Sequence, residues 1–265
     1  MAKLHGKPCW YELCTSDGSL GAAEEFYGKI LGWTFKDSGM PDFTYHLATA
    51  GGDMVAGLMN MPPDVKAMGM PPFWMIYFAV DDADKAAADV KAVGGKVYKE
   101  PADIPGTGRF AVLADPQGAG FGVLQPEPMP GGGEGGHAFD QQKQGHGNWQ
   151  ELMSTDPEAA WRFYAGLFGW SKGQAMPMGE MGTYQLFQHD GTDIGGMMGL
   201  GNSPVPAWLP YFGVNGLDPA IERIKAAGGK LAHGPTEVPG GAFIAVAQDP
   251  QGAWFALVGP KAATA

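Results

Sequence analysis

Two glutamates in matching surroundings are the residues of this sequence best suited to chemistry. Glu12 lies in the stretch WYELC, and Glu151 lies in WQELM, 139 positions later. If these stretches are β-strands, alternation places Trp10, Glu12 and Cys14 on one face. A carboxylate on an apolar surface needs a partner, and it could act as a general base or hold a cationic or hydroxylated ligand. The alternative is a Glu–Tyr hydrogen bond that only braces the sheet.

Both glutamates belong to a tandem repeat that covers most of the chain. Residues 10–33 read WYELCTSDGSLGAAEEFYGKILGW, and residues 149–170 read WQELMSTDPEAAWRFYAGLFGW. Each half closes with the same five letters, DPQGA, at 115–119 and again at 249–253. Repetition of this kind indicates duplicated structural units. Within each unit, DPQG reads as a turn between strands and not as a catalytic motif.

The hydrophobic pattern predicts two cycles of strand, helix and three strands in each half. In the first half it predicts helices that end near residues 31 and 93, and strands at 10–14, 33–36, 44–49, 54–59, 74–80, 96–100, 109–114 and 120–125. The proline-rich segment 61–72 is expected to be a connector without regular structure. The second half repeats this order. We therefore predict an α+β fold built from four β-α-β-β-β modules.

The domain boundaries follow from composition. Residues 126–147 are rich in glycine and proline and predict a linker outside the core, between a first domain at 1–125 and a second at 148–260. Four modules can complete two clefts within one chain, so we expect a self-sufficient two-domain monomer. Further oligomerisation stays open.

Charge and composition narrow the possible partners and the location. A formal net charge of −11 argues against nucleic acid and anionic membranes as partners. The two cysteines, Cys9 and Cys14, do not make a disulfide scaffold. The chain opens without an apolar run of signal-peptide length, and no stretch reaches the ~18 apolar residues of a membrane span. A soluble cytoplasmic protein is the expectation.

The repeated motifs resemble a known superfamily. Paired β-α-β-β-β modules that open with a strand, an Asp and FYGKILGW or FYAGLFGW, and close with DPQGA, are similar to the vicinal oxygen chelate superfamily. That group includes glyoxalase I, extradiol dioxygenases and bleomycin-resistance proteins. The resemblance implies two tandem glyoxalase-like domains, in each of which a pair of modules curls into a half-barrel around a cleft.

The resemblance also implies where a divalent metal would be held. In the metal-binding members the ligands are His or Gln, Glu, His and Glu, on the first and last strands of the modules. Here the matching positions offer no carboxylate or imidazole: they are Trp10, Gly57, Met75 and Gly122 in the first half, and Trp149, Gly196, Leu209 and Ala256 in the second. Such donors are what hard and borderline divalent ions require. We therefore expect no metal or other cofactor, unless the ligand positions are misaligned.

The same positions predict a pocket for an aromatic or hydrophobic small molecule. Trp10 and Trp149 supply flat apolar faces, and the three glycines are expected to leave space opposite them. We expect Tyr77 and Tyr211 to be the partners of Glu12 and Glu151. The predicted ligand-binding residues are Trp10, Cys14, Gly57, Met75, Tyr77 and Gly122, together with Trp149, Met153, Gly196, Leu209, Tyr211 and Ala256. The alternative is that the tryptophans only fill the core.

Two functions of different classes fit these residues. The first is a small-molecule binding protein of the glyoxalase and bleomycin-resistance type, without the usual metal ligands. The second is a glyoxalase-like lyase or isomerase. That enzyme would be either metal-independent, with Glu12 and Glu151 as the catalytic acid/base residues, or metal-dependent through ligands that the alignment does not identify. Cys14 could be a nucleophile only if something activates it, and its counterpart is Met153.

Overall fold

The structure is a computed structural model that describes residues 4–41, 43–127 and 136–263. The strands of the first half are β1 (Pro8–Thr15), β2 (Thr34–Asp37), β3 (Tyr45–Ala50), β4 (Asp53–Asn60), β5 (Phe73–Ala79), β6 (Lys96–Ile104), β7 (Gly108–Ala114) and β8 (Gly120–Pro126). Those of the second half are β9 (Gly147–Ser154), β10 (Ser171–Pro177), β11 (Thr183–His189), β12 (Thr192–Gly199), β13 (Ala207–Gly213), β14 (Lys230–Glu237), β15 (Phe243–Gln248) and β16 (Trp254–Gly259). The helices are α1 (Leu20–Leu31), α2 (Pro63–Ala67), α3 (Ala83–Ala92), α4 (Pro157–Phe168) and α5 (Leu217–Ala226), with a 3₁₀ turn at Gly179–Met181.

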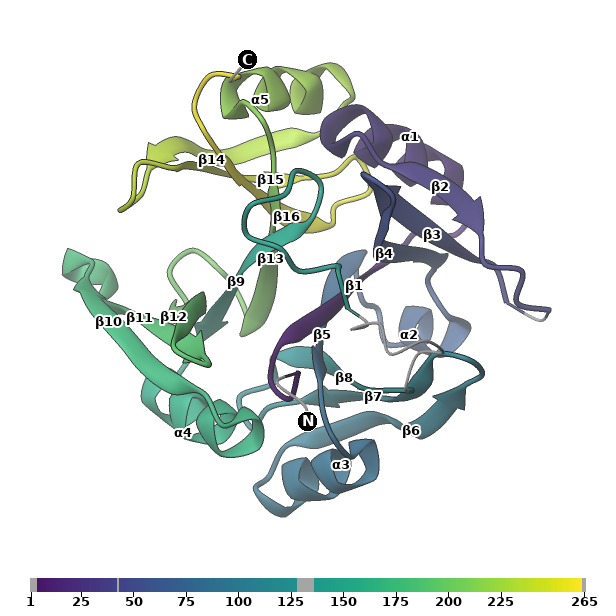
Figure 1. The fold of residues 1–265 in the computed structure, drawn as a ribbon, viewed down its shortest axis with the longest axis vertical. Coiled ribbons are helices and arrows are strands. Elements are labelled where there is room, and N and C mark those ends of the chain that lie inside the picture. The colour runs from purple at the N-terminus through teal and green to yellow at the C-terminus, as the bar shows by residue number, and fades with distance from the viewer. Residues whose placement is uncertain (1–3, 42, 128–135, 264–265) are drawn as a thin grey trace. The chain divides into compact units, whose positions relative to one another are not determined.

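The two halves form mixed sheets with the same strand order (Figure 1). The first sheet runs β2-β3-β4-β1-β5-β8-β7-β6, and the second runs β10-β11-β12-β9-β13-β16-β15-β14. In each sheet the first strand of the half pairs in parallel with the fourth, which is β1 with β4 and β9 with β12. The identical strand order of the two sheets confirms the predicted α+β fold and the tandem repeat.

One short helix was not expected. The segment 61–72, predicted to lack regular structure, contains the five-residue helix α2. Pro63 stands in its first turn, where the missing N–H costs no hydrogen bond and the fixed φ suits a helix start. The prolines that ruled out a long element are therefore compatible with one helical turn.

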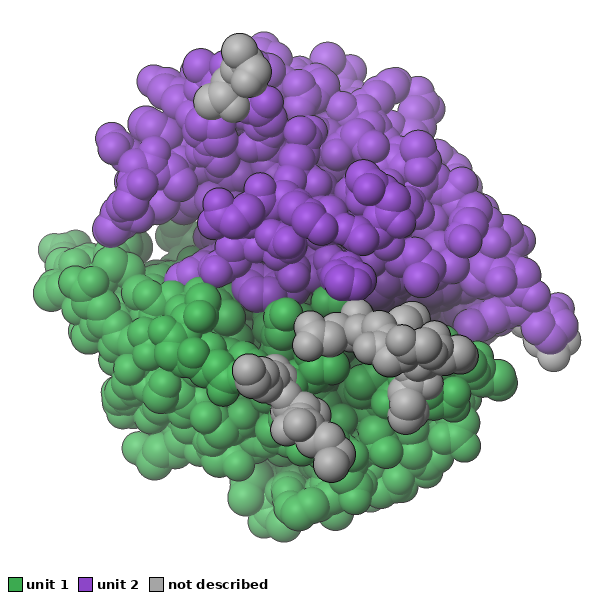
Figure 2. Space-filling view, in the orientation of Figure 1, with its two compact units in different colours: residues 1–9, 76–136, 150–209 green, residues 10–75, 137–149, 210–265 purple. Residues whose placement is uncertain are grey.

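The elements gather into two compact units that each take one module from either half (Figure 2). Unit 1 comprises residues 1–9, 76–136 and 150–209. Unit 2 comprises residues 10–75, 137–149 and 210–265. In unit 2 the helices α1 and α5, from opposite halves of the sequence, pack against each other (Figure 1). The interior of each unit is thus shared between the two sequence halves.

The core of unit 2 is a cluster of aromatic rings around Tyr27. This side chain is fully buried, stacks on Trp33 at 5.8 Å between ring centroids, and meets Trp74 edge-to-face at 5.2 Å. Phe212 and Phe255, from the second half of the chain, close the cluster. Offset and edge-to-face pairs of this kind add to the stabilisation that burial of the rings already gives.

A buried chain of hydrogen bonds runs through this core. The Trp74 indole Nε1 donates to the Tyr27 hydroxyl at 2.9 Å, and that hydroxyl donates to Asp249 Oδ2 at 3.0 Å. The other oxygen of Asp249 accepts the backbone N–H groups of Gln251 and Ala253, both at 2.9 Å. Burial raises the pKa of Asp249, because the charged carboxylate has left water. These bonds explain the DPQGA motif as a turn whose aspartate also holds a helix from the other half.

Unit 1 repeats the arrangement with the roles of the halves exchanged. Trp208 Nε1 donates to the Tyr164 hydroxyl, which donates to Asp115 Oδ2, both at 3.0 Å. Asp115 Oδ1 accepts three backbone N–H groups of its own turn, those of residues 117, 118 and 119, at 2.8–2.9 Å. The prediction that DPQG is a structural turn is therefore confirmed in both copies.

The segment predicted as an exposed linker is partly buried. Residues 128–135 lie outside the described residues, but Ala138, Phe139 and His146 are each less than 10% exposed. The Gly145 carbonyl accepts the indole N–H of Trp33 at 2.7 Å. A buried tryptophan needs such an acceptor, and this segment provides it. The expectation that all of 126–147 would lie outside the core is wrong for this part.

None of the helices in the described residues combines the length and the apolar character that a membrane-spanning helix needs.

We expect Tyr27→Phe to lower the free energy of unfolding by roughly 1–3 kcal/mol, because it leaves the buried Asp249 carboxylate and the Trp74 N–H without this partner. Chemical denaturation measures the change. Tyr98→Phe is the matched control: Tyr98 is 50% exposed, so its substitution should stay within about 0.5 kcal/mol of the original. Equal stability of the two variants would show that the Tyr27 hydroxyl does not hold the unit.

Candidate functional site

The glutamate of the first half sits in a hydrogen-bonded group on β1 and β3. The Trp10 indole Nε1 donates to the Tyr45 hydroxyl at 2.8 Å, and the Tyr45 hydroxyl donates to Glu12 Oε2 at 2.9 Å. Both Trp10 and Glu12 are half-buried, whereas Tyr11 and Leu13 between them are fully buried. The alternation confirms that Trp10 and Glu12 share a face of the strand.

Tyr45 is the residue that the sequence did not reveal. Tyr77 is the predicted partner of Glu12, and the structure shows in addition a hydrogen bond to this carboxylate from Tyr45, one strand beyond β4. The repeat carried the signal: Tyr184 follows Tyr45 by 139 positions, the same offset that relates Glu151 to Glu12. Burial, and then the neighbouring carboxylate, raise the pKa of Tyr45 well above its ordinary value. Its hydroxyl therefore stays protonated and acts as a donor.

The glycines do not leave open space. Gly57 pairs with Glu12 in the β1–β4 register, and a Cβ at Gly57 would lie 1.8 Å from the Tyr45 Oη. The Tyr45 ring thus occupies the room that the missing side chain provides. Gly122 makes the same room for Tyr77, with 2.2 Å from an ideal Cβ to the ring. The expectation of empty space opposite the tryptophans is wrong, because tyrosines fill it.

Gly196 in the second half also makes room for a tyrosine ring. It pairs with Glu151 in the parallel register of β9 and β12, and an added Cβ would lie 2.1 Å from the ring of Tyr184. Met153 pairs with Met198 two positions further along the same two strands. The arrangement of glutamate, glycine and tyrosine is therefore duplicated in both halves.

Cys14 is not activated as a nucleophile. Its side chain is 5% exposed, and burial first and Glu12 second raise the pKa of the thiol. A neutral thiol is a poor nucleophile. Its counterpart Met153 is half-buried and cannot replace it in a mechanism shared by both halves.

The predicted site residues are distributed over both units. Tyr77, Leu209 and Tyr211 are buried, and Tyr211 pairs in register with Ala256, the position equivalent to Gly122. Unit 2 holds Trp10, Glu12, Cys14, Gly57, Met75, Trp149, Tyr211 and Ala256. Unit 1 holds Tyr77, Gly122, Glu151, Met153, Gly196 and Leu209. Within unit 2 the structure brings Trp10, Glu12 and Gly57 together around Tyr45.

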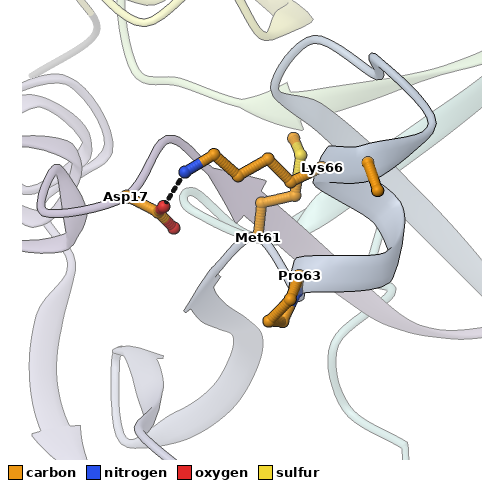
Figure 3. A pocket seen from close by; sticks show the side chains of 5 residues that line it. Asp17, Met61, Pro63 and Lys66 are labelled. Carbon is orange, nitrogen blue, oxygen red and sulfur yellow. Dashed lines mark hydrogen bonds and ion pairs between the residues drawn. The ribbon is translucent and has the colours of Figure 1, made fainter.

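A separate hollow lies beside α2 in unit 2 (Figure 3). It has a volume of about 500 Å³ and is lined by Asp17, Met61, Pro63, Lys66 and Ala67, so none of the predicted site residues lines it. Figure 3 shows the Lys66 ammonium group reaching to the Asp17 carboxylate. Both side chains are more than half exposed, and an ion pair of that kind contributes little to stability.

Comparison with known proteins assigns the chain to a family. The sequence model of the Glyoxalase/Bleomycin resistance protein/Dioxygenase superfamily matches residues 13–123 and 145–257. The chain belongs to this superfamily. The two matched regions are the two halves of the repeat, which confirms the expected pair of tandem glyoxalase-like domains.

Relatives match over nearly the full length. A Mycobacterium tuberculosis protein named "Putative glyoxylase CFP32" is 34% identical over 261 residues, which span 96% of this chain and 95% of CFP32. The "Anthracycline biosynthesis protein DnrV" of Streptomyces peucetius is 32% identical over 269 residues, which span 96% of this chain and 93% of DnrV. The Mn(II)-bound glyoxalase of Novosphingobium aromaticivorans matches 97% of this chain and 82% of its own, with a TM-score of 0.63 and 16% identity. At 16% identity, the similarity to the Novosphingobium protein shows a shared fold and nothing more.

The donor set does not fit the metal that the superfamily resemblance implies. Trp10 and Gly57 occupy two of the ligand positions in the first half, and the Trp10 indole nitrogen is a donor already committed to Tyr45. Among the residues that the structure describes, no three histidines, cysteines or carboxylates are grouped so as to hold a metal ion. The side chains at these positions therefore do not suit Zn²⁺, Ni²⁺, Mn²⁺ or Fe²⁺.

We expect that none of these four ions raises the melting temperature of the metal-free protein. An ion that binds the folded state must stabilise it by mass action, and added ion at about 100 times its Kd would contribute about 2.7 kcal/mol. Differential scanning fluorimetry with each ion and with a chelator checks this. A stoichiometric ion whose removal lowers the melting temperature would contradict the assignment of the ligand positions.

Proposed function

We propose that this chain is a small-molecule binding protein whose ligand is aromatic or hydrophobic. The observation that carries the proposal is the side chain of Trp10, which stands at a position where the superfamily resemblance implies a metal ligand. An indole stands where the superfamily resemblance implies a metal-binding side chain, and it is held by a tyrosine hydroxyl at 2.8 Å. What remains at this place is an aromatic surface beside one carboxylate. A surface of that composition favours a flat apolar ligand with one polar group.

Exposure of the side chains supports the proposal. Trp10 and Met75 are half-buried, so both keep accessible surface, in contrast to Tyr27, Trp33 and Trp74 of the core. Methionine and tryptophan together make an adaptable apolar lining, since the thioether is flexible and polarisable. A purely structural tryptophan would be expected to have the burial of Trp33 or Trp74.

One relative supports an aromatic ligand. DnrV, 32% identical over nearly its whole length, is named for anthracycline biosynthesis. Anthracyclines are built on fused planar rings, which is the shape that a tryptophan face binds. CFP32, which is named a glyoxylase, points instead toward the enzyme alternative.

We expect Trp10→Ala to weaken the binding of 2-naphthol about tenfold, or ~1.4 kcal/mol, because it removes the aromatic face. Isothermal titration calorimetry measures the Kd, and the melting temperature reports on folding. Trp254→Ala is the control, since Trp254 is 48% exposed and lies in β16, whereas the Trp10–Tyr45 hydrogen bond joins β1 and β3. Equal losses in the two variants, or no binding by the unsubstituted protein, would count against the proposal.

A second candidate function is an acid/base lyase or isomerase that uses Glu12 and Glu151. The hydrogen bond from Tyr45 to Glu12 favours it, because a fixed carboxylate is suited to proton transfer. In this case Glu12 would remove a proton next to a carbonyl group of the substrate, and Glu151 would do the same in the second half.

For this candidate we expect Glu12→Gln to lower turnover of the methylglyoxal–glutathione hemithioacetal by roughly 10²–10⁴-fold while the fold is retained. A spectrophotometric assay, run with and without added divalent metal, measures it. Glu158→Gln is the control, because Glu158 lies on the exposed side of α4. An unsubstituted protein without turnover in either condition would exclude this substrate and leave the binding function.

A further inference from the structure

The hollow beside α2 lies where two parallel strands end. Thr15, the last residue of β1, pairs in register with Asn60, the last residue of β4. The Met61 N–H then donates to the Thr15 carbonyl at 2.8 Å. The chain therefore leaves both strands at the same edge of the sheet, toward α1 in one case and toward α2 in the other. Side chains from these two connections and from α2 line the hollow.

The helix α2 gives the hollow an apolar lining beside a positive charge. Pro63 is followed at three and four positions by Lys66 and Ala67, which is the spacing of residues on one face of a helix. All three line the hollow together with Met61, which is 7% exposed. A thioether, a proline ring and a methyl group make a surface suited to an aliphatic group, and the flexible methionine can adapt to its shape.

Opposite charges stand side by side at this lining (Figure 3). The Lys66 ammonium group contacts the Asp17 carboxylate, and both side chains are more than half exposed. An exposed ion pair contributes little to stability, so holding the fold does not account for its place at the hollow. Because both groups remain in contact with water, further charges can approach them without the penalty of burying an ion.

Asp17 does not perform the helix-capping role of its counterpart in the second half. Asp156, 139 positions later, accepts a backbone N–H in the first turn of α4. Helix α1 instead starts after Ser19, and this N-cap makes no side-chain hydrogen bond. The Asp17 carboxylate is directed to Lys66, whose counterpart at the same offset is Val205. The pair of charges therefore belongs to the first half only, and one site per chain is expected.

We propose that this hollow binds a zwitterionic amino acid with an aliphatic side chain. An α-ammonium and an α-carboxylate are attached to the same carbon atom, so they lie side by side as the Lys66 and Asp17 groups do. The ligand carboxylate accepts from Lys66 and the ligand ammonium donates to Asp17, so each charge has an opposite neighbour. The aliphatic side chain lies against Met61 and Pro63. A ligand with a single charge meets the repelling member of the protein pair as well as the attracting one.

The size of the hollow and the charge of the protein support this ligand class. The volume of about 500 Å³ lies within the range of roughly 300–1,000 Å³ that small-molecule pockets have. A zwitterion carries no net charge, so the formal net charge of −11 on the protein does not repel it as it would an anion. None of the residues that line the hollow belongs to the proposed aromatic site, so the two binding functions are tested separately.

The test follows the Met61 methyl group by NMR of the full-length protein with ¹³C-labelled methionine methyl groups, and Met61→Leu identifies its resonance. We expect L-leucine to shift this resonance with a Kd on the order of 1 mM, because the charges are exposed to water. Two analogues, 4-methylpentanoic acid without the ammonium and 3-methylbutylamine without the carboxylate, should bind at least about fivefold more weakly. The resonance of Met54, an exposed methionine on β4 that does not line the hollow, should not move.

Variants of the ion pair test the role of the charges. Lys66→Gln should weaken leucine binding by about fivefold, because the ligand carboxylate loses its cation. Asp17→Asn should do the same through the ligand ammonium, and it replaces Lys66→Gln if that variant does not fold. Lys29→Gln is the matched control, since Lys29 forms an exposed ion pair with Glu25 in the same unit. Its leucine affinity should stay within about twofold of the original.

Three results would overturn the proposal. The first is a Met61 resonance that does not move at a leucine concentration about twentyfold above the expected Kd. The second is equal affinity for leucine and its two singly charged analogues. The third is leucine affinity that Lys66→Gln leaves unchanged, since recognition would then not depend on the charges. None of them concerns the binding of 2-naphthol, so failure of this proposal is distinguishable from failure of the proposed function.

Discussion

The buried bond between a tyrosine of one sequence half and an aspartate of the other is the interaction on which the structure depends. Tyr27 reaches Asp249 across 222 positions of sequence, and Tyr164 reaches Asp115 across 49. Each aspartate also closes its own DPQG turn, so one carboxylate holds a local loop and a distant helix together. Because a carboxylate buried without partners is costly, the helix and the turn must be present together for either to be well packed.

This constraint explains why the compact units do not coincide with the sequence halves. Each half forms its own sheet, but the aromatic cores lie between a module of one half and a module of the other. Tyr27, Trp33 and Trp74 pack with Phe212 and Phe255, and hydrogen bonding to Gly145 draws part of the intervening segment into the same core. Neither half of the sequence therefore forms a complete hydrophobic core by itself, although each half forms a sheet with the same strand order.

The sequence predicted what is local or repeated, and it missed what depends on tertiary packing. Strand phase placed Trp10 and Glu12 on one face, and proline with glycine marked the DPQG turns, because both properties act over a few residues. The hydrogen bond from Tyr45 to Glu12 was not predicted, since a tyrosine two strands away leaves no trace in local periodicity. Gly57 was misread because glycine permits close approach without saying what approaches. The bond from Tyr27 to Asp249 could not be foreseen from spacing at all.

Strand alternation keeps the residues that hold the fold apart from those of the candidate site. On β1, Tyr11 and Leu13 are fully buried while Trp10 and Glu12 are half-buried. On β5, Trp74 points to the hydrogen bond with Tyr27, and its neighbour Met75 projects to the opposite face. Substitutions on the site face can therefore change the chemistry of the candidate site without disturbing the Tyr–Asp bonds. A superfamily fold can in this way persist while its ligand chemistry changes, which is why the fold alone does not settle the function.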